Sequence, residues 1–188
     1  AKKAQNKMQM VVDILQNNFR DGQHWLVYCE DKDQLFSINE KLLEMELKPF
    51  MYYSDMGGGE KDELEAFTNN SGILLSINCL DEGIDIPVIS HAVIAASSRN
   101  PRQFIQRRGR VLRKHEGKIH AEVFDCLVLP KTKSSKKYNG LITGEIKRAI
   151  EFAIFSENQA ECIALLRSWL IELGTSPNEI MREEEEDE

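Results

Sequence analysis

The sequence has no long apolar run. No stretch approaches 18 consecutive apolar residues, which is about the length that a membrane-spanning helix needs. The first ten residues, AKKAQNKMQM, also lack the apolar core of a secretory signal peptide. We therefore expect an intracellular protein that does not enter a membrane, cytoplasmic in a prokaryote or nuclear in a eukaryote.

Cysteine is scarce and scattered along the chain. The sequence contains no Cys-x-x-Cys pair and no histidine cluster close to a cysteine, which are the spacings typical of metal and redox sites. Most of the cysteines lie in apolar segments, so buried free thiols are a better interpretation than disulfides or metal ligands. The four residues are Cys29, Cys79, Cys126 and Cys162.

The sequence has fewer basic than acidic residues, largely because of an acidic run at its C-terminal end. The formal net charge is −7, but the last six residues, EEEEDE, are all acidic, and without them the charge is −1. Such a run is typical of a solvated, disordered tail. A docking tail for a basic partner is the alternative.

Apolar residues alternate between helical and strand spacing. Helical stripes occupy residues 8–19, 35–45, 61–67 and 101–113, and five short apolar runs separate them: HWLVYC, KPFMYYS, GILLSI, HAVIAA and EVFDCLVL. Strands that are apolar on both faces and alternate with helices indicate a parallel sheet covered on both sides. We predict an α/β doubly wound domain of five or six strands, in which Asp31 and Gln34 cap one helix.

Changes in composition divide the rest of the chain. Residues 1–130 form the predicted main domain, and residues 131–140, KTKSSKKYNG, form a basic linker or loop. Residues 141–175 are predicted to be a pair of helices, with Ser156 and Gln159 as a second capping pair. These helices pack on the main domain or on something outside this chain, and residues 176–188 form the acidic tail.

Two segments that follow predicted strands carry candidate ligand-binding residues. In open parallel sheets, ligands gather at the carboxyl ends of the strands. After GILLSI comes NCLDEGIDIP, in which Gly83 lets the backbone approach a ligand closely. After HAVIAA comes a segment with seven basic and no acidic residues between Arg99 and Lys114. That density of charge predicts an anionic ligand or an acidic partner.

Arg110 and Arg113 are the best candidates for binding a phosphate. On a helix, residues three apart lie on one face with about 5 to 6 Å between their Cβ atoms. Two guanidinium groups on one face match a phosphate, which arginine binds in a bidentate manner. A solvated helix face, a localisation signal and a general nucleic-acid patch are the alternatives for this segment.

Four linked motifs resemble those of the superfamily-two helicases. LLSINCLDEGIDIP resembles their motif V, and QFIQRRGRVLR, further along the chain, resembles motif VI. HWLVYCED is similar to motif IV, and YYSDMGGGEKDELEAFTNNSGILLSI is similar to the segment that joins motif IVa to motif V. The order of these motifs along the chain agrees with the order in the family, from Gln23 to Leu129. The resemblance is strongest to the XPB-like DNA helicases and the motor subunits of restriction systems.

The motifs of the nucleotide-binding half of such motors are absent. The sequence has no G-x-x-x-x-G-K-[ST] loop and no D-E-x-[DH] box, the motifs that hold the phosphates and Mg²⁺. The resemblance therefore implies the second, C-terminal RecA-like domain alone. Such a domain works with a first RecA-like domain, with ATP and Mg²⁺ between the two, and we predict that this chain does not hydrolyse ATP by itself.

The resemblance also implies roles for individual residues around ATP. Arg110 and Arg113 would reach the γ-phosphate as arginine fingers. Gly83, Asp85 and Gln106 would lie near the nucleotide, with Asp85 facing the ribose. The roles of Arg107 and Arg108 stay open.

On the nucleic-acid side, the resemblance implies contacts with a strand backbone. Ser76 would bond a phosphate, with Ser54 and Asn78 as weaker candidates, and binding would be independent of sequence. The expected substrate is DNA, in repair or restriction, with further complex subunits possible. The alternatives are an RNA helicase domain and a non-catalytic module that binds nucleic acid or regulates a partner.

Overall fold

The computed structural model describes residues 2–77, 86–95, 115, 118–127 and 139–172. Contacts divide the chain into two compact units, residues 1–126 and 127–188, and each is described by itself. The domain boundaries predicted at residues 130, 140 and 175 stay predictions. The predicted helix at 101–113 and the acidic tail at 176–188 lie outside the described residues.

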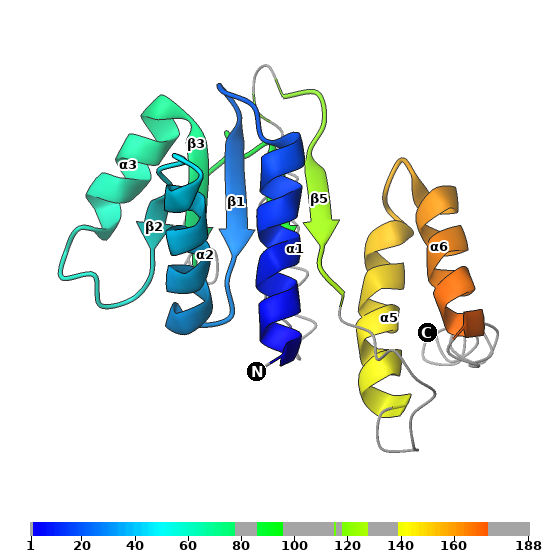
Figure 1. Ribbon diagram of the computed structural model, residues 1–188. Helices are drawn as coiled ribbons and strands as arrows, with labels where there is room; N and C mark the ends of the chain where they lie inside the picture. Colours follow the sequence, from blue (N-terminus) through cyan, green and yellow to red (C-terminus); the bar gives the residue numbers. More distant parts are fainter. Residues whose placement is uncertain (1, 78–85, 96–114, 116–117, 128–138, 173–188) are drawn as a thin grey trace. The chain divides into compact units, whose positions relative to one another are not determined.

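Five parallel strands form the sheet of the first unit (Figure 1). Their order across the sheet is β2-β3-β1-β4-β5, and every neighbouring pair is parallel. The predicted α/β fold with a parallel sheet is therefore confirmed. The strands are β1 (His24–Tyr28), β2 (Phe50–Tyr52), β3 (Gly72–Ser76), β4 (His91–Ile94) and β5 (Glu122–Asp125).

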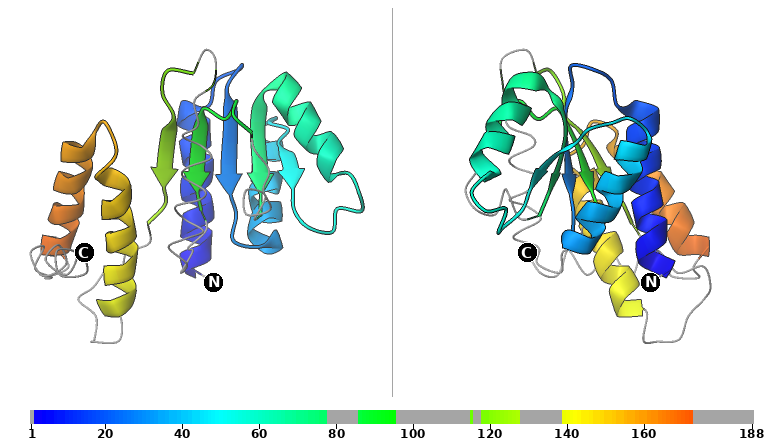
Figure 2. Two further views of the ribbon diagram at one scale, coloured as in Figure 1. Left: turned by 180° about the vertical axis from the view of Figure 1, so that it is seen from behind. Right: turned by 60° about the vertical axis from the view of Figure 1, so that its left-hand side comes forward.

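Helices cover both faces of this sheet (Figure 2). α1 (Lys2–Asn18) and α2 (Lys32–Glu44) lie on one face, and α3 (Glu60–Asn70) lies on the other. Successive side chains of a strand point to opposite faces. Trp25 and Val27 of β1 accordingly pack in the core beneath α1 and α2, whereas His24 meets the ring of Phe67 from α3, with centroids 5.2 Å apart.

Asp31 caps α2 as predicted. Its carboxylate accepts a hydrogen bond from the backbone N–H of Gln34 at 2.8 Å. The Gln34 side chain bonds back to the backbone N–H of Glu30 at 2.7 Å, one residue before the usual partner in a capping box. The cap fixes the start of α2 directly after β1, at the carboxyl edge of the sheet.

Gly72 begins β3 with a backbone conformation that favours glycine. Its φ is +124°, and a Cβ atom built there would lie 3.3 Å from Cε2 of Phe50. Both features disfavour a larger side chain at this position. They fix the close approach of β2 and β3 on the side of the sheet that α3 covers.

The second unit contains two helices, α5 (Asn139–Ala153) and α6 (Gln159–Glu172). Ile146 and Ile150 of α5 pack against Leu166 and Leu170 of α6. The predicted pair of helices is therefore present, but its predicted cap is wrong. The Ser156 hydroxyl donates to the carbonyl of Ala153 at 2.8 Å instead of capping α6, because a serine side chain can bond back to a carbonyl within one turn.

None of the helices in the described ranges is long and apolar enough to cross a membrane.

Candidate functional site

The carboxyl ends of the strands finish in one register across the sheet. Ser76 at the end of β3 pairs with Tyr28 of β1 on one side and with Tyr52 of β2 on the other. Tyr28 in turn pairs with Ile94 of β4, which pairs with Asp125 of β5. Register partners in parallel strands point to the same face, so this row carries three hydroxyls and a carboxylate on the face that α3 partly covers. The segments at 78–85 and 96–114 follow β3 and β4 in the chain.

Ser76 is fully buried in this row. Its backbone oxygen accepts a hydrogen bond from the backbone N–H of Cys29 at 2.8 Å, and its hydroxyl makes no hydrogen bond among the described residues. A buried hydroxyl without a partner destabilises a protein by about 1 to 3 kcal/mol, so this position favours a partner. A phosphate could reach the Ser76 hydroxyl only if a group that covers it moves. The predicted bond from Ser76 to a backbone phosphate stays a prediction.

Ser54 is exposed in the loop between β2 and α3. Carboxylates from the first turn of α3 bind the backbone of this loop and of β2, which precedes it. Glu60 accepts from the backbone N–H of Met56 at 3.0 Å, and Glu63 accepts from that of Met51 at 3.3 Å. Ser54 is therefore presented to solvent at the carboxyl edge of the sheet, where a nucleic-acid backbone could reach its hydroxyl.

A cationic and aromatic cluster beside Ser54 was not predicted from the sequence. Nζ of Lys32 lies 3.4 Å from Oδ2 of Asp55 and 5.2 Å from the centre of the Tyr53 ring. The Tyr53 ring meets the ring of Phe36 edge to face, with centroids 5.5 Å apart. The signal in the sequence was a lysine at the first position of the helix after motif IV, but its partners come from a loop 21 to 23 residues away.

Acidic residues outnumber basic residues in the part of the sequence that contains Ser54. Residues 6–77 contain thirteen acidic and six basic residues. Asp33 and Asp55 are exposed near the start of α2 and in the Ser54 loop, respectively. Negative charge repels a phosphate backbone, so binding at Ser54 is expected to be weak and to depend on salt.

The other predicted site residues lie outside the described residues. These are Asn78, Gly83 and Asp85, between β3 and β4, and Gln106, Arg110 and Arg113, between β4 and β5. Arg107 and Arg108 lie there as well. Their roles stay predictions that follow from the resemblance of their motifs.

The described cysteines are free thiols. Cys29 and Cys126 are buried and Cys162 is partly exposed, as predicted, whereas Cys79 lies outside the described residues. Burial raises the pKa of Cys29 to about 12, so its thiol stays protonated and unreactive at neutral pH. Within the described ranges, no group of three histidine, cysteine or acidic side chains could hold a metal ion.

Known proteins are similar in sequence to the first unit. A family model described as the helicase conserved C-terminal domain matches residues 6–115, more than half of the chain. A protein of Methanocaldococcus jannaschii named as an ATP-dependent RNA helicase, MJ1505, is 26% identical over an aligned length of 124 residues, and the match covers 61% of this chain and 16% of that protein. The DNA 3'-5' translocase XPB2 of Sulfurisphaera tokodaii is 26% identical over 114 residues, 60% of this chain and 25% of that protein. The chain thus spans a quarter or less of the length of these relatives.

The fold is shared with solved structures. The structure of S. cerevisiae Dbp5 bound to RNA and ADP BeF3 matches with a TM-score of 0.59 at 17% identity, over 77% of this chain and 36% of that one. At this identity the likeness shows the fold alone. It confirms the RecA-like arrangement of the parallel sheet and its helices.

Proposed function

Because this chain belongs to the helicase conserved C-terminal domain family, we propose that it is the second motor domain of an ATP-dependent DNA helicase or translocase. One observation carries the proposal. The motif V segment runs on from β3, and the motif VI segment comes after β4, in a parallel sheet whose strands end in one register. Ligands of such sheets bind at that edge.

In this proposal the chain completes an ATP site that a first RecA-like domain holds. That domain would carry the phosphate-binding loop and the acidic box, and with them Mg²⁺. Arg110 and Arg113 would stabilise the negative charge that develops on the γ-phosphate, an effect worth roughly 10³ to 10⁵ in rate in NTPases that use arginine fingers. Gly83, Asp85 and Gln106 would contact the nucleotide.

The same domain would hold one nucleic-acid strand by its backbone. Exposed Ser54 is the described candidate that a phosphate can reach directly, and Ser76 and Asn78 are the others. A motor has to bind every sequence, so contacts to the backbone are expected rather than contacts to base edges. ATP binding would close the two domains and hydrolysis would reopen them, which moves the strand.

DNA is the proposed substrate, and RNA is the alternative. The two relatives differ on this point at equal identity, since one is named for RNA and the other for DNA. The resemblance of motifs V and VI to the XPB-like motors supports DNA. We also propose an intracellular location, with DNA repair or restriction as the setting and further subunits as possible partners.

Reconstitution with a first RecA-like domain tests the proposal. ATP turnover of the pair, and of each domain alone, is measured without nucleic acid and with double-stranded DNA, single-stranded DNA or RNA. We expect turnover only from the pair and stimulation chiefly by DNA. Stimulation by RNA alone would favour the alternative substrate. A pair that binds ATP but turns it over no faster than the first domain alone would indicate a non-catalytic module.

A further inference from the structure

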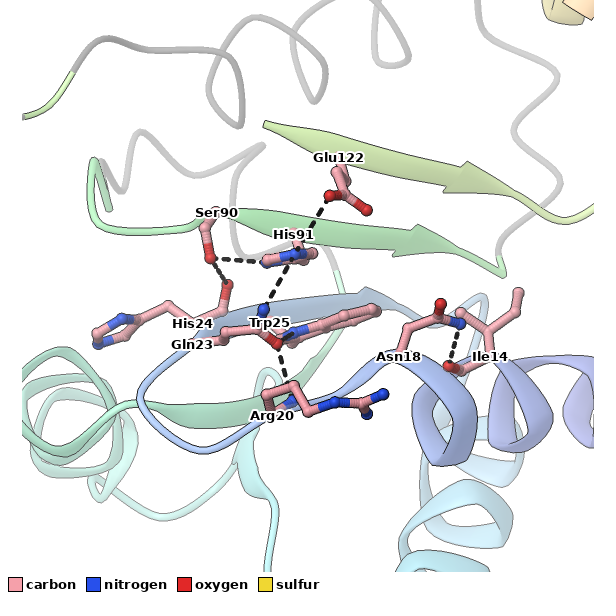
Figure 3. A network of polar contacts seen from close by, with 9 residues as sticks. All are labelled: Ile14, Asn18, Arg20, Gln23, His24, Trp25, Ser90, His91 and Glu122. Carbon is pink, nitrogen blue, oxygen red and sulfur yellow. Dashed lines mark hydrogen bonds and ion pairs between the residues drawn. The ribbon is translucent and has the colours of Figure 1, made fainter. Parts of the chain in front are cut away.

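A connected set of side chains lies at the amino edge of the sheet, the opposite edge from the candidate site (Figure 3). Gln23, in the turn between α1 and β1, is its centre. Oε1 of Gln23 accepts two hydrogen bonds of 2.8 Å, one from the indole N–H of Trp25 and one from the backbone N–H of Arg20. These bonds fix the orientation of the amide, because its oxygen must face both donors. Nε2 of Gln23 is therefore a donor that points away from them.

His91 at the start of β4 meets this donor. Its Nε2 lies 3.4 Å from Nε2 of Gln23, and its Nδ1 lies 2.8 Å from Oγ of Ser90. The Ser90 hydroxyl is also 3.2 Å from the backbone oxygen of His24, which can only accept. One arrangement of protons satisfies every group. Ser90 donates to His24, Nδ1–H of His91 donates to Ser90, and the lone pair on Nε2 of His91 accepts from Gln23.

Protonation of His91 breaks this arrangement at one point. A proton on Nε2 would face the amide N–H of Gln23, so two donors would oppose each other. The acceptor within reach is the carboxylate of Glu122 on β5, whose Oε1 lies 3.9 Å from Nε2 of His91. The His91 side chain is only 12% exposed, and burial lowers its pKa, while the charge of Glu122 raises that pKa to a smaller extent.

Within the described residues, the face of the ring meets an aromatic side chain rather than a charged one. Trp25 of β1 stacks on the imidazole, with centroids 4.4 Å apart and an angle of 7° between the planes. An aromatic face attracts a cation, so the ring stays stacked when it is protonated. From the turn, the guanidinium of Arg20 bonds to the carbonyls of Asn17 and Phe19.

We propose that His91 is a protonation-controlled latch on the turn between α1 and β1. The neutral ring holds Gln23, and the protonated ring releases Gln23 and pairs with Glu122. The bond from Gln23 is long, so the latch depends on the match of donor and acceptor more than on the strength of one bond. This inference does not depend on the proposed function.

Release of Gln23 loosens specific contacts. The side chain of Gln23 holds the backbone N–H of Arg20 and the indole of Trp25, and its backbone oxygen accepts from the N–H of Gly72 at 2.8 Å. Protonation should therefore loosen the turn at residues 19–23 and leave the centre of the sheet unchanged. Leu26, in the middle of β1 and fully buried, serves as the internal reference.

The test is a pH titration of the isotopically labelled 188-residue chain by NMR. The ring nitrogen shifts of His91 should show the Nδ1–H tautomer at neutral pH. As His91 titrates, the exchange of the Arg20 amide and of the Trp25 indole N–H, corrected for intrinsic rates, should rise several-fold with the same midpoint. The corrected rate at Leu26 should not change. A neutral His91 protonated on Nε2, or Arg20 and Trp25 reporters that do not respond, would overturn the proposal.

Two variants and one control variant sharpen the test. Gln23→Glu keeps the acceptor for Trp25 and Arg20 but offers His91 a carboxylate. The midpoint of the His91 titration should therefore rise by about one pH unit. The release of residue 23 from His91 in acid should vanish. Glu122→Gln should lower the midpoint. His24→Gln, which changes the neighbouring histidine on the other face of β1, should leave the His91 midpoint unchanged. A Gln23→Glu midpoint equal to that of the unmodified chain would contradict the latch.

Discussion

Asp55 Oδ2 lies 3.4 Å from Nζ of Lys32, beside the exposed Ser54. This ion pair is exposed, with 48% of the Lys32 side chain and 86% of the Asp55 side chain open to solvent, so it adds little to stability. Its consequence is electrostatic. Asp55 neutralises the positive charge of Lys32 beside a candidate backbone contact.

Replacing Asp55 by asparagine should therefore strengthen nucleic-acid binding. We expect the affinity of the chain for a labelled single strand to rise about two- to five-fold at low salt, because one repulsive charge is removed and Lys32 is freed. Fluorescence anisotropy measures the affinity. The gain should shrink at high salt, where exposed charges are screened. Glu44→Gln, which removes an exposed carboxylate from the far end of α2, should have a smaller effect, and equal effects would refute a contact near Ser54.

Gly72→Ala should destabilise the first unit by about 1 to 3 kcal/mol. The φ of +124° is strained for alanine, and its Cβ would lie 3.3 Å from the Phe50 ring. Urea unfolding followed by circular dichroism measures the change. Gly59→Ala is the matched control, because its φ is −84° and no atom lies within 4 Å of a Cβ built there. Equal stability of the two variants would show that Gly72 is not constrained in this way.

The stability of the domain should fall in mild acid because of His91. Burial lowers the pKa of His91 in the folded protein below its ordinary value of 6.5. The contribution of the neutral ring to stability is then complete above pH 6.5, and it is lost as pH falls from 6.5 through the lower folded pKa, where the unfolded chain binds more protons. The free energy of unfolding, measured in urea at several pH values, should depend less on pH in His91→Gln. An unchanged dependence would contradict the assignment.

Thiol reactivity should differ sharply among the described cysteines. Cys162 is partly exposed, whereas Cys29 and Cys126 are buried, and the pKa of Cys29 is raised to about 12 by burial. In the native protein at pH 7.5, iodoacetamide should label Cys162 well before the other two. Mass spectrometry of tryptic peptides gives the order, and denaturant should abolish the difference. Labelling of Cys29 at the rate of Cys162 would contradict its buried position.

Patterns within a short stretch of sequence predicted the helices, strands and caps better than they predicted which elements lie side by side. The cap of α2 was predictable because Asp31 and Gln34 act within one turn of helix. The same kind of pattern failed at Ser156, because its hydroxyl bonds back to Ala153 instead. Two bonds within reach of one serine compete locally, and the sequence does not show which one forms.

Contacts that depend on strand order were not predictable. Ser76 was correctly placed at the end of a strand, but its burial depends on Tyr28 and Tyr52, which the register of two other strands brings beside it. The stack of Trp25 on His91 likewise requires β4 to lie next to β1. Apolar periodicity identifies strands and says nothing of which strands are neighbours.

The proposed role of this chain in ATP hydrolysis is tested by the ATP turnover of the reconstituted pair of RecA-like domains with Arg113→Ala. Turnover at saturating nucleic acid should fall by at least about 10³-fold, because the transition state loses an arginine finger. Lys48→Ala, which removes an exposed cation from the first unit, should leave turnover unchanged. Turnover of the Arg113→Ala pair within a few-fold of the unmodified pair would show that Arg113 is not an arginine finger.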